Sequence, residues 1–337
     1  MKDKKKLILN ILFFSCLILI TYYVIFKDYS MKDILDRIKE SNHNYLLLAF
    51  ILMWFYFLFE AINIKLILSS FKEKLSLCKS IVFTLICFLF SAITPGGSGG
   101  QPVAIYYLSK EKIKVSHSAL SYLIMLFGYN ICSILLGVLF SIIYKDIFDA
   151  KLRLLFIVGT LFVMVPIALT FIGIFCKSLT NKLVNLVIKI LTKFKSKKVD
   201  EFKDKIHEEL KVFNDSSTYI KNHKKEFAKS FGLSLLQVIC NYTIPYLIYR
   251  SFGLDLYTLV FIFALQAILH NCVASIPLPG AVGITETAFL MIYSIIYPVK
   301  LIHSSLIVTR FITFYAFVII SLITFIIYQI VHKKQNN

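Results

Sequence analysis

The sequence predicts an all-α polytopic membrane protein, and three observations support that fold class. Hydrophobic residues make up 58% of the 337 residues, and the mean hydropathy of +0.76 exceeds that of an ordinary soluble domain. The apolar residues form long runs suited to bilayer-crossing helices rather than a strand-like alternation. Two of these runs are interrupted by Gly- and Pro-rich stretches in opposite halves of the chain.

The first predicted element is the apolar run 7–26, which follows the basic start "MKDKKK". It is longer than the apolar core of a signal peptide and no small-residue cleavage site follows it, so we expect a membrane anchor. The later candidate segments, in order, are 45–70, 80–94 with 102–112, 116–144, 154–176, 228–249, 257–275 with 284–296, and 303–331. About six segments are full spans, and the two pairs are half-segments.

Each pair of half-segments predicts a re-entrant hairpin that returns to the side of the membrane from which it enters. Both termini then lie on one side, and the two hairpins enter from opposite sides. The loops on the side of the termini carry most of the Lys and Arg residues, which predicts cytoplasmic termini in a bacterial-type plasma membrane. Opposed broken helices in two halves also indicate an inverted repeat with a site near the midplane.

We expect a single integral membrane domain over residues 1–337. Its first half covers 7–176, its second half covers 227–337, and a cytoplasmic basic linker covers 177–226. The linker begins "NKLVNLVIKILTKFKSKK", whose lysines recur on one helical face. That pattern predicts a helix lying on the anionic inner leaflet, although the same lysines would also enforce the topology. A shorter interfacial helix is expected at "SMKDILDRIKES".

The two interruptions are "TPGGSGGQP", residues 94–102, and "SIPLPGAVGITETAF", residues 275–289. In lipid, each backbone group released from helical bonding costs several kcal/mol, so such stretches persist where protein buries them or where they line a wet cavity. The half-helices that follow, near Val103 and Ile284, would direct N–H groups at an anion such as a phosphate. The alternative is a tight interhelical turn without a ligand. The glycine spacing fits no nucleotide-binding loop.

Few ionisable residues fall inside the candidate segments, where each is costly without a partner. Glu60 lies deep in its segment and either joins the site or bonds to a neighbouring helix. Glu286 begins the half-helix after the second interruption, where it binds or caps. Arg310 lies too deep to reach the surface, so we expect Glu286 as its resting partner and a lipid phosphate as competitor. Lys65 can extend to the surface, and His270 is typical of a packed polar residue.

No metal site or cofactor is expected, because the seven cysteines form no CxxC pair and no His/Cys cluster has zinc-ligand spacing. No Ser/His/Asp set lies at one membrane depth, so the residues themselves favour no enzymatic activity and no catalytic residue. Tyrosines near the ends of segments indicate anchoring at the membrane interface rather than nucleic-acid binding.

At "ITPGGSGGQPVAIYYLSKE" and "IPLPGAVGITETAF" the chain resembles the membrane region of the lysylphosphatidylglycerol synthases, also called flippase-like integral membrane proteins. The resemblance covers essentially the whole chain. It departs at Ala281, where the family often has a second glycine. Carried over position by position and joined with the polar residues above, it predicts a substrate-binding set of Thr94, Pro95, Ser98, Gly99, Gly100, Gln101, Pro102, Pro279, Gly280, Gly283, Thr285, Glu286, Arg310 and Glu60.

The resemblance implies translocation of an anionic or aminoacylated phospholipid of the lysyl-phosphatidylglycerol type, linked to resistance against cationic antimicrobial peptides. Inner-leaflet phospholipids are the expected partners, with a soluble aminoacyl-lipid synthase and a second copy of the chain as further candidates. The full-length synthases carry an acyltransferase-like domain that uses lysyl-tRNA, and we expect this chain, ending "HKKQNN", to lack it. The alternatives are a phosphatidylglycerol lysyltransferase acting with a separate catalytic domain, and a membrane scaffold that recruits a partner through residues 177–226.

Overall fold

The computed structural model describes residues 31–193, 208, 210–215, 218 and 224–335, apart from residues 275, 277 and 279. The predicted span at 7–26 and much of the predicted linker lie outside the described residues. The described elements are all helical: α2 (Met31–Glu40), α3 (His43–Ser70), α4 (Leu77–Ala92), α5 (Gly100–Lys110), α6 (Val115–Ile143), η1 (Lys145–Ile147), α7 (Ala150–Phe175), α8 (Lys177–Lys193), α10 (Lys224–Ser251), α11 (Leu259–Val273), α12 (Ile284–Tyr293), α13 (Val299–Arg310), η2 (Phe311–Tyr315) and α14 (Ala316–Gln335).

Five described helical stretches are long and apolar enough to cross a membrane: α3, α6, α7, α10 and the continuous stretch Val299–Val331. The shorter apolar helices are α4, α11 and α12. The predicted fold class is therefore confirmed, and the chain is an all-α polytopic membrane protein. The short helix expected after residue 30 is α2, and the helix expected at the start of the linker is α8.

Polar caps fix where several of these helices begin. The N–H groups at a helix start have no intrahelical acceptor, and a side-chain oxygen just before the helix can supply one. The Asp149 carboxylate accepts from the Leu152 N–H at 2.7 Å at the start of α7. The Ser76 hydroxyl caps α4 and the Thr258 hydroxyl caps α11, and each accepts from a backbone N–H of its own helix at 3.3 Å. The chain thus turns at defined residues between apolar runs.

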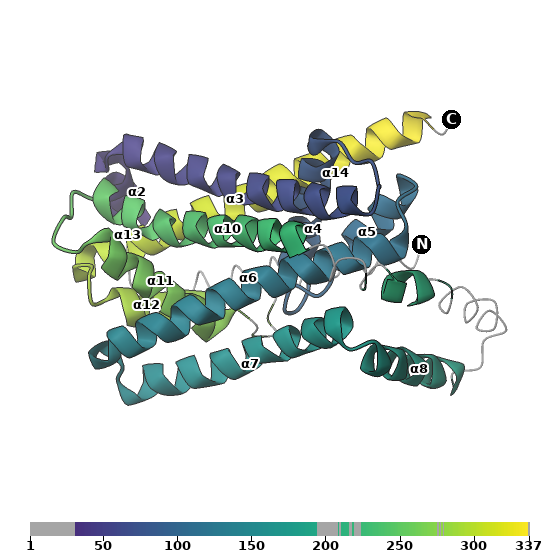
Figure 1. Ribbon diagram of the computed structural model, residues 1–337. Helices are drawn as coiled ribbons and strands as arrows, with labels where there is room; N and C mark the ends of the chain where they lie inside the picture. Colours follow the sequence, from purple (N-terminus) through teal and green to yellow (C-terminus); the bar gives the residue numbers. More distant parts are fainter. Residues whose placement is uncertain are drawn as a thin grey trace.

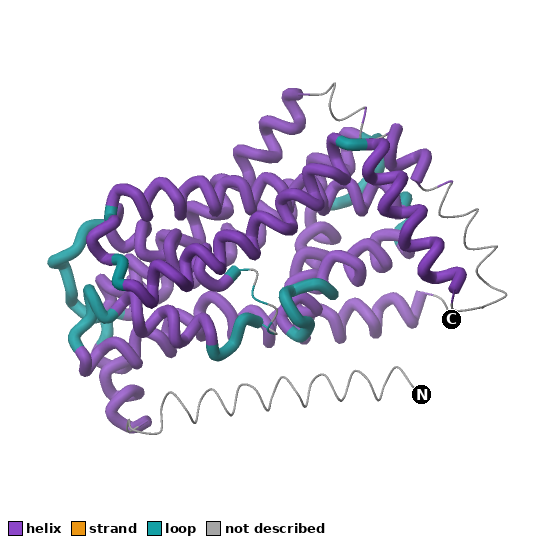
Figure 2. Tube along the Cα trace, turned by 90° about the horizontal axis from the view of Figure 1, so that it is seen from below, coloured by secondary structure: helices purple, strands orange, loops and turns teal. Residues whose placement is uncertain are grey.

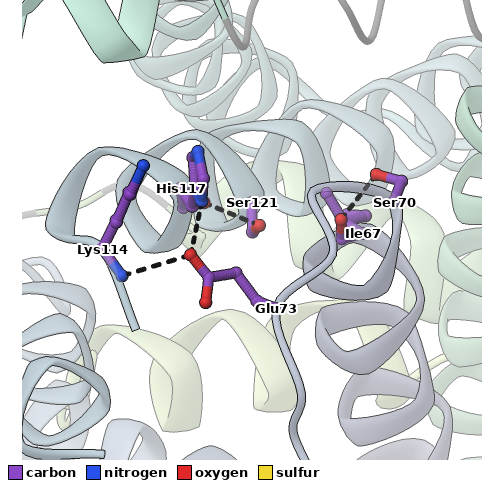
Figure 3. A network of polar contacts seen from close by, with 6 residues as sticks. All are labelled: Ile67, Ser70, Glu73, Lys114, His117 and Ser121. Carbon is purple, nitrogen blue, oxygen red and sulfur yellow. Dashed lines mark hydrogen bonds and ion pairs between the residues drawn. The ribbon is translucent and has the colours of Figure 1, made fainter. Parts of the chain in front are cut away.

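The first hairpin, α4–α5, returns to the end of the bundle at which it starts. Lys79, in the first turn of α4, pairs with Glu111, directly after α5, with Nζ and Oε2 2.5 Å apart. At the same end, Glu73 Oε1 lies 2.6 Å from His117 Nδ1 and accepts from the Lys114 N–H at 3.5 Å (Figure 3). The loop before α4 is thereby joined to the start of α6.

The second hairpin, α11–α12, also returns to its starting end. The Tyr257 hydroxyl, before α11, donates to the Ile295 carbonyl, after α12, at 3.1 Å. The Tyr293 hydroxyl of α12 donates to Gln266 of α11 at 2.8 Å. Figure 1 shows the α4–α5 hairpin and the α11–α12 hairpin toward opposite ends of the bundle, as the sequence predicts for opposed re-entrant segments.

The two halves pack against each other reciprocally. α3 packs along α10, α4 packs against α14 of the other half, and α11 packs against α6 of the first half. In each half a long helix precedes the hairpin and another follows it. This exchange of equivalent contacts is the arrangement that an inverted repeat produces.

The two interruptions meet inside the bundle. Figure 2, in which loops are teal, shows loop segments facing one another near the middle of the bundle, away from the loops at its ends. Ala92, at the end of α4, packs with Val282 of the second interruption and with Phe314 of η2. The fold therefore brings both Gly- and Pro-rich stretches to one region.

Candidate functional site

An ion pair organises the second interruption. Arg310 Nε lies 2.6 Å from Glu286 Oε1, and these side chains are 10% and 4% exposed. The two atoms are not aligned for a hydrogen bond, so the contact is electrostatic. Glu286 Oε2 accepts from the Gly283 N–H at 2.6 Å, and Arg310 donates to the Gly280 carbonyl at 3.2 Å. The pair expected from the sequence is present, and Glu286 also caps α12.

The Arg310 guanidinium rests on aromatic side chains of the same helix. Its central carbon lies 4.5 Å from the ring centre of Phe314 and 5.6 Å from that of Tyr315, within reach of cation–π attraction. The π-helix η2 begins directly after Arg310, and such widened turns are frequent at functional sites. Because Phe314 also packs against Ala92, this cluster connects the last span with both interruptions.

Arg310 is already neutralised within the protein. A lipid phosphate that reached this guanidinium would have to displace both Glu286 and the Gly280 carbonyl. The expectation that Arg310 directly binds phosphate therefore stays a prediction, and the contacts observed hold the second interruption in place.

The first interruption is shaped by contacts within its own turn. The Thr94 hydroxyl donates to the Phe90 carbonyl at 2.7 Å and accepts from the Gly99 N–H at 2.9 Å. A Cβ on Gly99 would lie 2.5 Å from Thr94 Cγ2, and a Cβ on Gly100 would lie 2.5 Å from the Cys87 carbonyl oxygen. These residues thus allow α5 to approach α4 closely. α5 begins at Gly100, earlier than the expected Val103, and the Gly99 N–H is already bonded.

The remaining predicted site residues differ in position. Pro95, Ser98 and Pro102 are exposed, and Thr285 is half-buried in the first turn of α12. Pro279 lies outside the described residues. Substrate binding by these residues stays a prediction.

A cavity of about 240 Å³, lined by both polar and apolar side chains, lies between the two hairpins. Gln101, in the first turn of α5, and Ala274, directly after α11, contribute to its wall. Glu60 of α3 also lines it, and its Oε2 accepts from Gln237 Nε2 of α10 at 2.9 Å. The complete lining is Tyr56, Glu60, Cys87, Phe88, Ser91, Gln101, Tyr122, Met125, Leu126, Tyr129, Asn130, Gln237, His270 and Ala274.

The charge of this cavity favours a cation over an anion. Glu60 is the acidic side chain in the lining, and no Lys or Arg is among the described residues that form the wall. A carboxylate inside a membrane-spanning bundle is unfavourable in ionised form unless a cation or hydrogen-bond donors neutralise it. The rings of Tyr56, Tyr122 and Tyr129 add faces that attract cations. An ammonium group fits this wall better than a phosphate does.

A larger cleft, of about 490 Å³, opens at the end of the bundle that holds the α2–α3 junction. Its walls include Arg37, Arg250 and Asp255, and none of its described lining residues belongs to either interruption. We place the functional site in the smaller cavity because both hairpins and the half-buried Glu60 carboxylate meet there.

Sequence reasoning singled out Glu60 and Gln101 as site residues but not the tyrosines beside them. Tyr56 lies four residues before Glu60, and Tyr122 lies seven before Tyr129, so each pair shares a helix face. Polar residues repeated at helical spacing within an apolar run are the sequence pattern that could have indicated these tyrosines. Gln237, by contrast, joins the site through an interhelical hydrogen bond from α10 to Glu60 of α3.

Ala281 sits in a backbone conformation that favours glycine, with φ of 48°. We expect Ala281→Gly to raise the free energy of unfolding by about 0.5–1 kcal/mol, because glycine removes the Cβ strain of this region. Thermal unfolding in detergent measures the change. Ala274→Gly is the matched control, since Ala274 has a right-handed helical φ of −58° and glycine there should lower stability. Equal shifts for both variants would contradict this assignment of strain.

Comparison with known proteins gives two matches. The family model described as "Lysylphosphatidylglycerol synthase TM region" matches residues 7–321. A "UPF0104 membrane protein" of Archaeoglobus fulgidus is 24% identical over 283 residues, which cover 82% of this chain and 84% of that protein. The match to the family model includes both interruptions and every residue of the cavity wall.

Proposed function

Because the chain belongs to the family of lysylphosphatidylglycerol synthase membrane regions, we propose that it moves a phospholipid with an ammonium-bearing headgroup, such as lysyl-phosphatidylglycerol, between the leaflets of the membrane. One observation carries this proposal: the cavity between the two hairpins holds a carboxylate and no basic side chain among its described lining residues. A headgroup with a positive charge gains an ion pair there, whereas plain phosphatidylglycerol meets a like charge.

The uncharged polar groups of the wall suit the rest of such a headgroup. Gln101, Asn130 and Gln237 supply amide donors for phosphate and ester oxygens. Hydrogen bonds from neutral groups lower the cost of taking a phosphate out of water without fixing it in place. Weak binding of the phosphate and specific binding of the ammonium are the properties that a translocation path needs.

We place both termini and the open end of the α4–α5 hairpin in the cytoplasm. That end carries the Lys79–Glu111 pair and leads toward the Lys-rich loops, which the positive-inside rule keeps cytoplasmic. The lipid then enters from the inner leaflet and leaves at the outer leaflet. An ammonium lipid exposed outside reduces the negative surface potential that attracts cationic peptides, which accounts for peptide resistance.

Reconstituted liposomes test the proposal. Lysyl-phosphatidylglycerol placed in the inner leaflet is followed by a membrane-impermeant amine reagent, and labelled phosphatidylglycerol is followed in parallel. We expect the protein to move the lysyl lipid at least about tenfold faster than phosphatidylglycerol, the ratio that one favourable charge contact of ~1.4 kcal/mol gives. Glu60→Gln should remove this preference.

Glu111→Gln is the matched control, because it makes the same chemical change at the surface end of the first hairpin. No protein-dependent movement of either lipid would contradict the proposal. Faster movement of phosphatidylglycerol than of the lysyl lipid would contradict the assigned headgroup.

Each of the two alternative functions predicts a different experimental result. Formation of lysyl lipid from lysyl-tRNA by this chain would favour a lysyltransferase, the activity that the family description suggests. A scaffold that recruits a partner would retain its function when the contacts of Arg310 and Glu286 are removed.

A further inference from the structure

We infer that Glu60 binds either a proton or the ammonium group of the lipid, in alternation, so that an inward proton movement drives outward lipid movement. The inference rests on the proposed function and adds an energy source to it. Its basis is a contrast between two carboxylates inside the same bundle, Glu286, which is buried, and Glu60, which is half-buried at the cavity.

Glu286 is neutralised by the protein itself. It pairs with Arg310 and accepts from the Gly283 N–H, so its charge is balanced in every step that leaves the second interruption intact. Glu60 has one hydrogen bond, from Gln237, and no ion pair with a basic side chain of the described residues. As far as the described residues go, neutralisation of Glu60 is therefore left to what enters the cavity.

Two entering species can neutralise this carboxylate. A proton from water converts it to the acid, and an ammonium group forms an ion pair with it. The cavity of about 240 Å³ is large enough for a small polar headgroup or for several water molecules that carry protons. The ionised and unpaired state of Glu60 is costly inside the membrane. The carboxylate therefore gives up its proton when an ammonium group takes its place, and gives up the ammonium group when a proton takes its place.

The other titratable groups that face Glu60 come from four helices. They are Tyr56 on α3, Cys87 on α4, Tyr122 and Tyr129 on α6, and His270 on α11. Phenols and thiols ordinarily titrate well above neutral pH, so imidazole is the other group here whose charge ordinarily changes near pH 7. The ring of His270 packs against Tyr129 and Tyr242, with ring centres 5.7 and 5.6 Å apart, respectively. A test must therefore separate Glu60 from His270.

The exchange balances one proton against one ammonium group. On the cytoplasmic side the O–H bond of Glu60 breaks, its proton leaves to cytoplasmic water, and the ammonium forms the ion pair. On the outer side the headgroup leaves, and a proton from outer water forms the O–H bond again. The net result is one proton inward for each ammonium headgroup outward.

The experiment imposes a pH difference of one unit across proteoliposomes, with the membrane potential held at zero by equal potassium and valinomycin. The probe is a lysyl-phosphatidylglycerol analogue whose amines are trimethylated, so the lipid cannot cross by losing a proton. We expect it to accumulate in the leaflet that faces the acidic side, up to about tenfold per pH unit at equilibrium. A protonophore should abolish the accumulation.

Glu60→Gln should abolish accumulation, Glu60→Asp should retain it at a lower rate, and Glu111→Gln should match the wild-type protein. If the wild-type protein equilibrates the analogue equally with and without the gradient, the exchange is wrong and the proposed translocation stands. If it moves neither the analogue nor lysyl-phosphatidylglycerol, the proposed function itself fails. If His270→Gln abolishes accumulation while Glu60→Gln retains it, the assignment to Glu60 is overturned.

Discussion

Replacing Arg310 with alanine should lower the free energy of unfolding by about 3–5 kcal/mol, the typical cost of removing one partner from a buried ion pair. The variant leaves the Glu286 carboxylate, which is 4% exposed, without its countercharge. It also removes the bond to the Gly280 carbonyl and the packing on Phe314. Chemical or thermal unfolding in detergent, compared with wild type, measures the loss.

The double variant Arg310→Ala with Glu286→Gln provides the control. A neutral amide at position 286 no longer needs a countercharge and can still accept from the Gly283 N–H, so part of the stability should return. If the Arg310→Ala variant unfolds within about 0.5 kcal/mol of wild type, the ion pair does not hold the second interruption.

Gly100→Ala should produce the second large effect, a destabilisation of about 1–3 kcal/mol together with loss of lipid movement. The added Cβ would collide with the Ser91 hydroxyl and lie 2.5 Å from the Cys87 carbonyl oxygen. The hydroxyl can rotate away, but the backbone carbonyl cannot, so α5 must shift from α4. Since Ser91, Cys87 and Gln101 all line the cavity, the shift also distorts the site.

Gly232→Ala is the matched control for this prediction. Gly232 lies inside α10, and a Cβ there meets no atom within 4 Å, so alanine should stabilise the helix slightly. Unfolding free energies and translocation rates of the two variants are compared side by side. Equal behaviour of the two variants would show that close approach of α5 to α4 is unnecessary.

The opposed hairpins could be predicted because glycine and proline are costly in a lipid-exposed helix. A chain that keeps "TPGGSGGQP" and "SIPLPGAVGITETAF" within apolar runs must shield such stretches from lipid, with protein or with a wet cavity. The structure packs the end of α4, at Ala92, against Val282 of the second stretch, while Pro95, Ser98 and Pro102 of the first stretch stay exposed. The Arg310–Glu286 pair could be predicted for a similar reason. An arginine this deep needs a partner, and Glu286 is the nearest carboxylate in the sequence of that half.

The cavity could not be predicted, because its wall depends on how six separate helices pack together. Tyr56, Tyr122 and Gln237 belong to α3, α6 and α10, and nothing in their local sequence states that they face one another. The expectation for the first interruption was also too simple. Thr94, Gly99 and Gly100 make their contacts within the turn or with α4, and Gln101 is the residue of that stretch that reaches the cavity.

A headgroup cross-linking experiment tests the central claim most directly. Lysyl-phosphatidylglycerol that carries a diazirine on its lysyl group is irradiated with the protein in lipid nanodiscs, and mass spectrometry locates the adducts. The account predicts adducts at the cavity residues Met125, Tyr129 and Gln237, and a marked decrease of these adducts in Glu60→Gln. Adducts confined to the exposed outer face of α7, at Leu161 and Val165, with none in the cavity, would contradict it.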